Sequence, residues 1–293
     1  MFLATPTEPE QVLRVSGPAN ARAPLVLDSP HSGTVYPPDY RPALAAAQLR
    51  GLEDAFVDEL FEHAPNAGAT LVAAQFPRAY IDPNRAIDDI HTPALADRWP
   101  HVSRPTQKAL LGVGLVFTRT PEGDPIYAAP LSSAEVSHRI RHYYCVYHQR
   151  LRRELAAART TFGFVWHLNC HSMPSRPGHF ASKAKDRRAD FCLGDRHGTT
   201  CAPEFTDAVA QYLKKLGYSV AINVPYAGIE CVRRFGRPAS NVHSLQLEIN
   251  RDLYMDERRH ARDDGFNALR ANLDSLVNML ASSALSESRR AAE

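Results

Sequence analysis

The sequence predicts an α/β protein that folds as a three-layer sandwich, with a mixed, largely parallel central sheet between two layers of helices. Short apolar runs rich in β-branched residues alternate along the chain with longer amphipathic stretches, as expected when helices connect parallel strands. Several of the apolar runs have almost no polar positions, which is typical of strands covered on both faces.

Six segments have the length and composition of buried strands. They are residues 24–27, 70–75, 114–118, 163–169, 218–224 and 244–249. The last segment contains Glu248, and a charged side chain is almost never buried without a partner. We therefore expect Glu248 either to pair with an arginine such as Arg251 or to face a functional site.

Four segments have the periodicity of helices, namely residues 53–63, 133–159, 205–216 and 257–280. The second is the clearest, because apolar side chains from Val136 to Leu155 recur at three- or four-residue steps. Ser132 and Glu135 predict a capping box at its start. Gly217 predicts the end of the third helix.

The chain has no internal repeat and no linker rich in Pro, Gly or Ser. We therefore expect a single α/β domain over residues 1–281, followed by a polar, disordered tail over residues 282–293. Residues 82–125 are rich in Pro, Asp, His and Arg and lack periodicity. Such a long irregular stretch within a compact domain is usually a functional loop.

The composition excludes several classes of protein. The 34 Lys and Arg residues nearly balance the 32 Asp and Glu residues, whereas nucleic-acid-binding proteins carry a strongly basic face. No apolar run approaches the roughly 20 residues that cross a bilayer, so we expect no membrane partner. Five irregularly spaced cysteines, and a start without a signal-peptide pattern, predict a cytoplasmic protein with reduced thiols. The oligomeric state stays open.

Two histidines lie where predicted strands end, and the carboxyl ends of strands form the ligand crevice of open α/β sheets. His31 follows the first strand, beside Pro30 and Gly33, where it can bind a metal, act as a base or hydrogen-bond the turn. His171 is a better metal-ligand candidate than His167, which lies four residues earlier in the strand. His167 fits a core or supporting position.

Acidic and basic residues flank these strand ends. Asp54 and Asp58 lie on one predicted helical face, where they can bind a metal or form a solvated acidic first turn. Arg78 and Arg85 follow the second predicted strand. Arginine binds carboxylates with two parallel hydrogen bonds, and salt bridges to neighbouring aspartates are the structural alternative.

The candidate residues form a coherent set. Two histidines and one carboxylate around an open position are the usual ligands of a catalytic zinc ion. A glutamate outside the metal shell, such as Glu248, can act as the general base. Arginines can stabilise an oxyanion or bind a substrate carboxylate.

Seven stretches of the chain match one family. They are DSPHSG (28–33), EDAFVDELF (53–61), FPRAYIDPNR (76–85), NCHSMP (169–174), LGDRHGTTC (193–201), NVPYAG (223–228) and LQLEINRDLYMDE (245–257). Over residues 24–280 the chain resembles the N-formylglutamate amidohydrolases, or formylglutamate deformylases, of histidine degradation, which are related to zinc carboxypeptidases and aspartoacylase. The resemblance implies a phosphorylase/hydrolase-like α/β fold and one zinc ion per chain. It also implies hydrolysis of N-formyl-L-glutamate, a linear amide, to formate and L-glutamate.

The resemblance also implies the metal ligands. His31 and His171 are similar to the zinc-binding histidines of the family. Zinc carboxypeptidases take their acidic ligand from an HxxE motif, but Thr34 occupies that position here. We assign the acidic ligand to Asp54, with Asp58 as the fallback.

The other site residues follow from the same resemblance. Glu248 is similar to the glutamate that acts as general base and acid. The stretch ending in Asn84 and Arg85 resembles the DLNR motif of aspartoacylase, which implies that both bind the substrate carboxylate, with Arg251 as a further anchor. Arg78 is similar to the arginine that polarises the scissile carbonyl.

Three departures from the family pattern leave the substrate open. They are Asn169 in place of Asp, the run GVGLVFTRT over residues 112–120, and Ile229-Glu230 where a second Gly is expected. Another small anionic N-acyl amino acid, such as N-formylaspartate, is therefore an alternative substrate. A non-catalytic zinc-binding protein is the other alternative, and Glu248 speaks against it because a closed structural site needs no uncoordinated glutamate.

Overall fold

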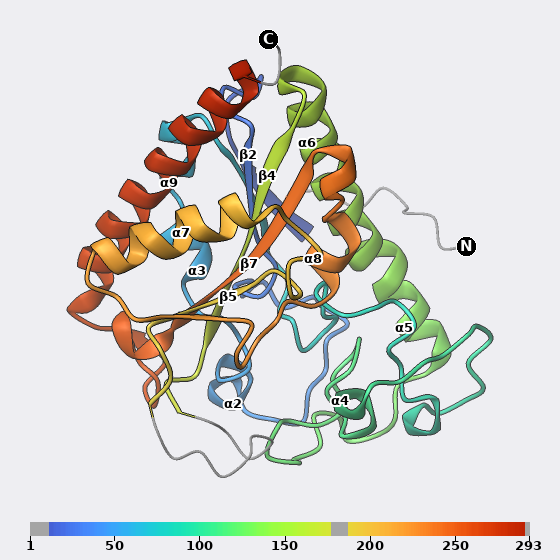
Figure 1. Cartoon of the computed structure of the whole chain (residues 1–293). Helices are drawn as coiled ribbons and strands as arrows, with labels where there is room; N and C mark the ends of the chain where they lie inside the picture. Colours follow the sequence, from blue (N-terminus) through green and yellow to red (C-terminus); the bar gives the residue numbers. More distant parts are fainter. Residues whose placement is uncertain (1–11, 177–186, 291–293) are drawn as a thin grey trace.

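The computed structural model describes residues 12–176 and 187–290 (Figure 1). Seven strands form one sheet in the order β1-β3-β2-β4-β7-β5-β6. Their bounds are β1 Leu13–Ser16, β2 Leu25–Ser29, β3 Thr70–Ala74, β4 Val165–Met173, β5 Phe191–Gly194, β6 Val220–Ile222 and β7 Val242–Asn250. The central strands β3, β2, β4 and β7 are parallel, whereas β1 and β5 run antiparallel to β3 and β7. The predicted mixed, largely parallel sheet is confirmed.

Helices cover both faces of this sheet (Figure 1). One core contains side chains of α3 (Val57–Leu60), α7 (Pro203–Lys215) and α9 (Gly265–Arg290), and the other contains side chains of α5 (Ser133–Arg139) and α6 (Cys145–Phe162). Because neighbouring residues of a strand point to opposite faces, Leu25 and Leu27 enter the first core and Val26 enters the second. The predicted three-layer sandwich is therefore confirmed.

Shorter elements complete the described part of the chain. They are α2 Ala46–Arg50, α4 Gln107–Leu110, α8 Glu230–Phe235, the ribbon of β8 Met255–Asp256 and β9 Ala261–Arg262, and single 3₁₀ turns at Ala64–Ala67, Thr92–Ala94, Pro238–Ser240 and Arg251–Leu253. No helix within residues 12–176 and 187–290 combines the length and apolar character that crossing a membrane requires. No disulfide joins any of the five cysteines.

The long predicted helix is confirmed with one modification. The Oγ of Ser132 accepts from the Glu135 N–H at 3.2 Å, and the Glu135 carboxylate accepts from the Ser132 N–H at 2.7 Å, so the capping box forms as predicted. A π turn at Ile140–Tyr144 separates α5 from α6. The predicted helix over residues 53–63 shortens to the single turn of α3, which begins after Phe56 at a positive φ of 66°.

The structure differs from the strand predictions in one predicted strand that does not form and two strands that were not predicted. Residues 114–118 form a mostly buried loop with a single bridge between Val113 and Phe117, and the Leu115 N–H donates to the Asp89 carbonyl of another loop at 2.8 Å. Strands β1 and β5 were not predicted, since each has only four residues and such short runs carry little periodicity.

The prediction of a disordered tail from residue 282 is wrong for residues 282–290. Helix α9 continues to Arg290, because Ala284 is fully buried and Leu285 packs against the same core. The Ser288 hydroxyl also donates to the Phe162 carbonyl at 2.8 Å. Residues 291–293 lie outside the described part of the chain.

Gly33 allows the loop after β2 to cross the end of β3. A Cβ at this position would lie 2.3 Å from the carbonyl carbon of Gln75 and 2.4 Å from the carbonyl oxygen of Phe76. Backbone atoms cannot move aside as a flexible side chain can, so we expect Gly33→Ala to lower the free energy of unfolding by about 1–3 kcal/mol. Urea unfolding measures this loss.

Gly51→Ala is the matched control, because Gly51 has a helical φ of −63° and its Cβ would lie no closer than 3.3 Å to a neighbour. An equal loss in both variants would contradict the importance of the close approach at Gly33.

Candidate metal centre and active site

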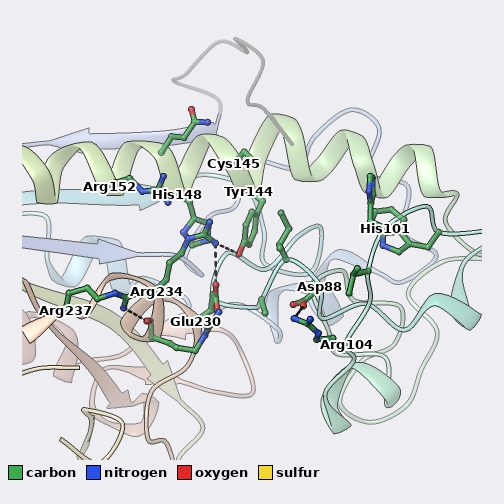
Figure 2. A pocket seen from close by; sticks show the side chains of 16 residues that line it. Asp88, His101, Arg104, Tyr144, Cys145, His148, Arg152, Glu230, Arg234 and Arg237 are labelled. Carbon is green, nitrogen blue, oxygen red and sulfur yellow. Dashed lines mark hydrogen bonds and ion pairs between the residues drawn. The ribbon is translucent and has the colours of Figure 1, made fainter. Parts of the chain in front are cut away.

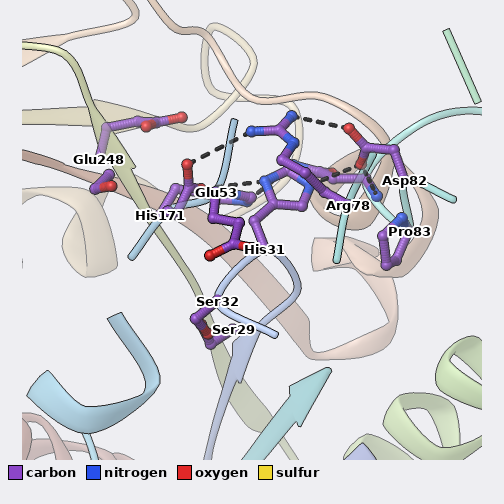
Figure 3. A network of polar contacts seen from close by, with 12 residues as sticks. Ser29, His31, Ser32, Glu53, Arg78, Asp82, Pro83, His171 and Glu248 are labelled. Carbon is purple, nitrogen blue, oxygen red and sulfur yellow. Dashed lines mark hydrogen bonds and ion pairs between the residues drawn. The ribbon is translucent and has the colours of Figure 1, made fainter. Parts of the chain in front are cut away.

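Three predicted metal ligands come together at the carboxyl edge of the parallel strands (Figure 3). His31 follows β2, His171 lies near the end of β4, and Asp54 precedes α3. The Asp54 N–H donates to the His31 carbonyl at 3.1 Å, so a backbone hydrogen bond joins the two loops. The predicted convergence of strand ends thus holds for all three residues.

The geometry of these residues suits a metal ion. The Oδ2 of Asp54 lies 3.1 Å from the Nδ1 of His31 and 2.9 Å from the Nδ1 of His171. The ligand atoms all lie within 4.8 Å of one another, and all three side chains are buried. Two imidazole nitrogens and one carboxylate are a donor set that Zn²⁺ commonly takes.

The outer nitrogens of both histidines have polar partners. The Nε2 of His31 lies 2.6 Å from the ionised Asp82 carboxylate, which can only accept, so this nitrogen donates. The Nε2 of His171 lies 2.9 Å from the Asn169 Oδ1 and 2.9 Å from the Asn84 Nδ2. A cation bound at the two Nδ1 atoms would leave these outer contacts in place.

Asp54 is held as a carboxylate. Burial alone would raise its pKa, but the contacts with His171 and His31 and the charge of Arg78 hold the pKa of Asp54 well below its usual range. Its second oxygen accepts from Arg251 at 3.1 Å and from Arg78 at 3.5 Å. Asp54 is therefore an ionised carboxylate whose position is fixed by two arginines, and such a group can bind a cation.

Glu248 lies beside the metal ligands and faces the site. It is paired in register with His171 on the neighbouring strand, so the two side chains share one face of the sheet. Its carboxylate accepts from Gln246 at 2.7 Å, and it forms no ion pair with any residue in the described ranges. Burial and the charge of Asp54 raise the pKa of Glu248 to about 7, a value suited to a general base near neutral pH.

The predicted site residues Arg78 and Arg85 have different environments. Arg78 donates to Asp82 at 2.8 Å and reaches Asp54 at 3.5 Å, so it bridges both carboxylates (Figure 3). Arg85 is buried, but its nearest carboxylates, Asp82 and Asp89, are each 3.9 Å away. The Nε of Arg85 has no hydrogen-bond partner among the described residues, and burial lowers the pKa of its guanidinium. Arg85 is thus a buried cation with unused donors.

Arg251 and Asn84, which were predicted to bind the substrate, form hydrogen bonds within the protein. Arg251 donates to the Glu53 carbonyl at 2.7 Å and to the Ser172 hydroxyl at 3.0 Å, in addition to Asp54. Asn84 accepts from the Cys231 N–H at 2.8 Å through its Oδ1.

The fallback ligand Asp58 lies outside the cluster. It pairs with Arg14 at 2.8 Å and does not belong to the group of atoms that could hold a metal. His167 is a buried supporting residue, as predicted, since its ring nitrogens contact Asp28 at 2.8 Å and Ser244 at 2.7 Å.

Sequence reasoning missed two residues of the site. Asp82 lies in the stretch FPRAYIDPNR but was assigned no role at the metal site, although it accepts from the outer nitrogen of His31. Lys108, on α4, lies near enough to Arg85, Arg78 and Glu248 for their charges to act on it, and partial desolvation together with both arginines lowers its pKa. The only signal for Lys108 was its place in the irregular segment 82–125, which does not single out one residue.

Comparisons with known proteins give the relatives of the whole chain. A family model described as N-formylglutamate amidohydrolase matches residues 23–255. The N-formylglutamate deformylase of Pseudomonas putida is 30% identical over 80% of this chain and 83% of its own length, and that of Pseudomonas aeruginosa is 30% identical over 88% and 93%. The crystal structure of an N-formylglutamate amidohydrolase from Ralstonia eutropha has 44% identity and a TM-score of 0.90, covering 94% of this chain and 98% of that one. A gene product of Agrobacterium tumefaciens, at 20% identity and a TM-score of 0.67, shares the fold.

The raised pKa of Glu248 predicts a pH-dependent stability. Its pKa is about 7 in the folded protein and near 4.5 ordinarily, so the fold favours the neutral carboxyl. Stability due to this group is complete below pH 4.5 and is lost as the pH rises through 7. We expect the metal-free wild type to lose on the order of 2 kcal/mol relative to Glu248→Gln between pH 4.5 and 8.

Urea unfolding in the presence of a chelator measures both proteins across this range. The same pH dependence in both would show that Glu248 titrates normally.

Proposed function

The chain belongs to the N-formylglutamate amidohydrolase family, and from this premise we propose that His31, Asp54 and His171 hold one zinc ion beside a catalytic pair, Glu248 and Arg78. The activity is that of the family: water cleaves the amide of N-formylglutamate and yields formate and glutamate. The observation that carries the assignment of the site is the buried group of His31, Asp54 and His171, whose ligand atoms all lie within 4.8 Å of one another, with Glu248 paired in register beside His171.

The ligand set supports zinc as the metal. Two neutral imidazoles and one carboxylate leave a position open for water or substrate, as catalytic zinc sites do. When bound, the ion would lower the pKa of a water molecule and polarise the formyl carbonyl. Asp82 and Asn169 orient the two histidines through their outer nitrogens, and Arg251 orients Asp54.

Glu248 moves the proton. Its carboxylate takes a proton from the attacking water, whose oxygen bonds to the formyl carbon. When the C–N bond breaks, the amine nitrogen of glutamate takes this proton from Glu248. One group can serve as base and then as acid because its pKa is close to the working pH.

Arg78 stabilises the negative charge that develops on the formyl oxygen. Its guanidinium is fixed by Asp82 and Asp54, so it need not reorganise during the reaction. Its Nε has no partner in the described structure, which leaves a donor for the substrate.

The carboxylates of the substrate supply most of the binding energy, because a formyl group is very small. Arg85 and Lys108 are the cations that can receive them, since neither has a carboxylate within hydrogen-bond distance among the described residues. Asn84 contributes by holding this segment against α8 through the Cys231 N–H. N-formylaspartate presents the same charges on a chain one methylene shorter, so the ratio of kcat/KM values for the two substrates decides between them.

Removing the metal and removing the base should have separable effects. A chelator should abolish formate release, and added Zn²⁺ should restore it.

Glu248→Gln should still bind one equivalent of zinc, since Glu248 is not a ligand, but should lose at least 10²-fold in kcat. Formate release and metal analysis on the same samples measure this. Loss of zinc from Glu248→Gln, or near-normal turnover, would refute the assignment.

Arg85→Ala should weaken the recognition of carboxylates. Loss of a charge-assisted hydrogen bond costs about 1.5–3 kcal/mol, so we expect kcat/KM for N-formylglutamate to fall roughly 10- to 200-fold. Hydrolysis of an N-formyl amino acid amide, which has no carboxylate, should change little. Arg85→Lys is the conservative control and should recover part of the loss. Equal losses on both substrates would contradict a role in carboxylate binding.

A further inference from the structure

A cavity that none of the metal ligands lines adjoins residues 83–85. It has a volume of about 780 Å³ and lies between α6, α8 and residues 86–104 (Figure 2). This volume is within the range of about 300–1,000 Å³ that is usual for small-molecule sites. None of the residues assigned to the metal, the proton transfer or the substrate carboxylates lines it.

The cavity is lined by an excess of arginines. We call it the arginine groove, after Arg104, Arg152, Arg233, Arg234 and Arg237. Its two acidic residues neutralise only part of this charge. Asp88 pairs with Arg104 at 3.4 Å, and Glu230 pairs with Arg233 at 2.5 Å and Arg234 at 3.4 Å.

Two of these arginines have no carboxylate partner in the described part of the chain. Arg237 donates only to the backbone carbonyls of Arg233 and Gly236, at 2.9 and 2.6 Å. Arg152, on α6, forms no ion pair with any described residue. Figure 2 shows Arg237, Arg234 and Arg152 toward one end of the groove. A planar arginine fork matches the oxygens of a carboxylate or phosphate.

The rest of the groove is partly apolar. Ile87, Trp99 and Val102 contribute to its wall, and Val102 is 66% exposed. An exposed aliphatic side chain next to an aromatic ring gains from covering by an apolar group. The groove therefore combines a cationic end with an apolar one.

The floor of the groove is bonded to the substrate-binding segment. The Nε2 of His148 donates to the Pro83 carbonyl at 2.9 Å, and the Tyr144 hydroxyl donates to the Arg85 carbonyl at 3.0 Å. Arg234 in turn donates to the Tyr144 oxygen at 3.0 Å. A chain of two hydrogen bonds thus leads from a groove arginine to the backbone of Arg85.

His148 has an unused acceptor at this floor. Burial lowers its pKa to about 3, so the ring is neutral and its Nδ1 is a lone-pair acceptor. This atom has no hydrogen-bond partner in residues 12–176 and 187–290, and the residue is only 2% exposed. Buried polar atoms are rarely left unsatisfied without a reason.

We propose that the arginine groove is a second anion-binding site, for a small carboxylate or phosphate with an apolar part, and that its occupancy alters substrate binding through residues 83–85. The site is independent of the metal. An anion that binds Arg234 would weaken its hydrogen bond to Tyr144, whose hydroxyl in turn donates to the Arg85 carbonyl. Because Arg85 is assigned to binding the substrate carboxylate, KM should respond more than kcat.

Binding is tested on metal-free protein without substrate, so that its outcome does not depend on the proposed reaction. Calorimetric titrations with phenyl phosphate, benzoate and inorganic phosphate distinguish the two anion chemistries and the contribution of the apolar part. We expect phenyl phosphate or benzoate to bind more tightly than inorganic phosphate, and the tighter of the two identifies the anion. Absence of binding by both aromatic anions would overturn the proposal.

Charge reversal locates the bound anion. Arg152→Glu should weaken binding at least 10-fold. Arg153→Glu is the matched control, because Arg153 is an exposed arginine on the same helix that does not line the groove, and it should stay within twofold of the wild type. Equal weakening in both variants would show general charge attraction only. Loss of binding in Arg85→Ala would place the anion in the active site. Either result overturns the proposal.

The coupling is measured on the zinc-loaded enzyme. Without added anion, Arg152→Glu should hydrolyse N-formylglutamate like the wild type, since Arg152 does not touch the active site. A saturating aromatic anion should shift KM at least twofold in the wild type and in Arg153→Glu, but not in Arg152→Glu. A shift that persists in Arg152→Glu, or no shift in the wild type, would refute the coupling.

Discussion

The carboxylate of Asp54 is the interaction on which the rest of the site depends. One of its oxygens lies between the Nδ1 atoms of His31 and His171, and the other accepts from Arg251 and Arg78. These partners come from the loops after β2, β3 and β7 and from β4 itself. A single ionised group thus joins four parallel strands at their carboxyl edge, and its burial is tolerated because each of its oxygens has two polar neighbours.

The sequence predicts most of the fold and the part of the site that lies at strand ends. Long apolar runs and the three- to four-residue period from Val136 to Leu155 reflect burial, which acts on many residues at once. His31 and His171 could be assigned because the ends of parallel strands must meet. Glu248 could be identified because a lone charge in a buried strand requires an explanation.

The remaining features depend on contacts between distant segments. Choosing Asp54 over Asp58 requires knowing that the chain turns at Phe56 with a positive φ, which separates two acids that a regular helix would place on one face. Arg251 was assigned to the substrate, but its hydrogen bonds to Asp54, Glu53 and Ser172 are formed within the protein. Lys108 lies in a segment without periodicity, so only the folded loop brings it near Arg85.

The π turn between α5 and α6 lets one continuous helix serve two environments. A π turn inserts one residue relative to an α-helix, and each residue of an α-helix rotates its side chain by about 100°. The face that buries Arg139 against the Tyr80 ring before the turn is therefore out of phase with the face that carries His148 after it. This offset allows the same helix to contact the Tyr80 ring on one side and the backbone of residues 83–85 on the other.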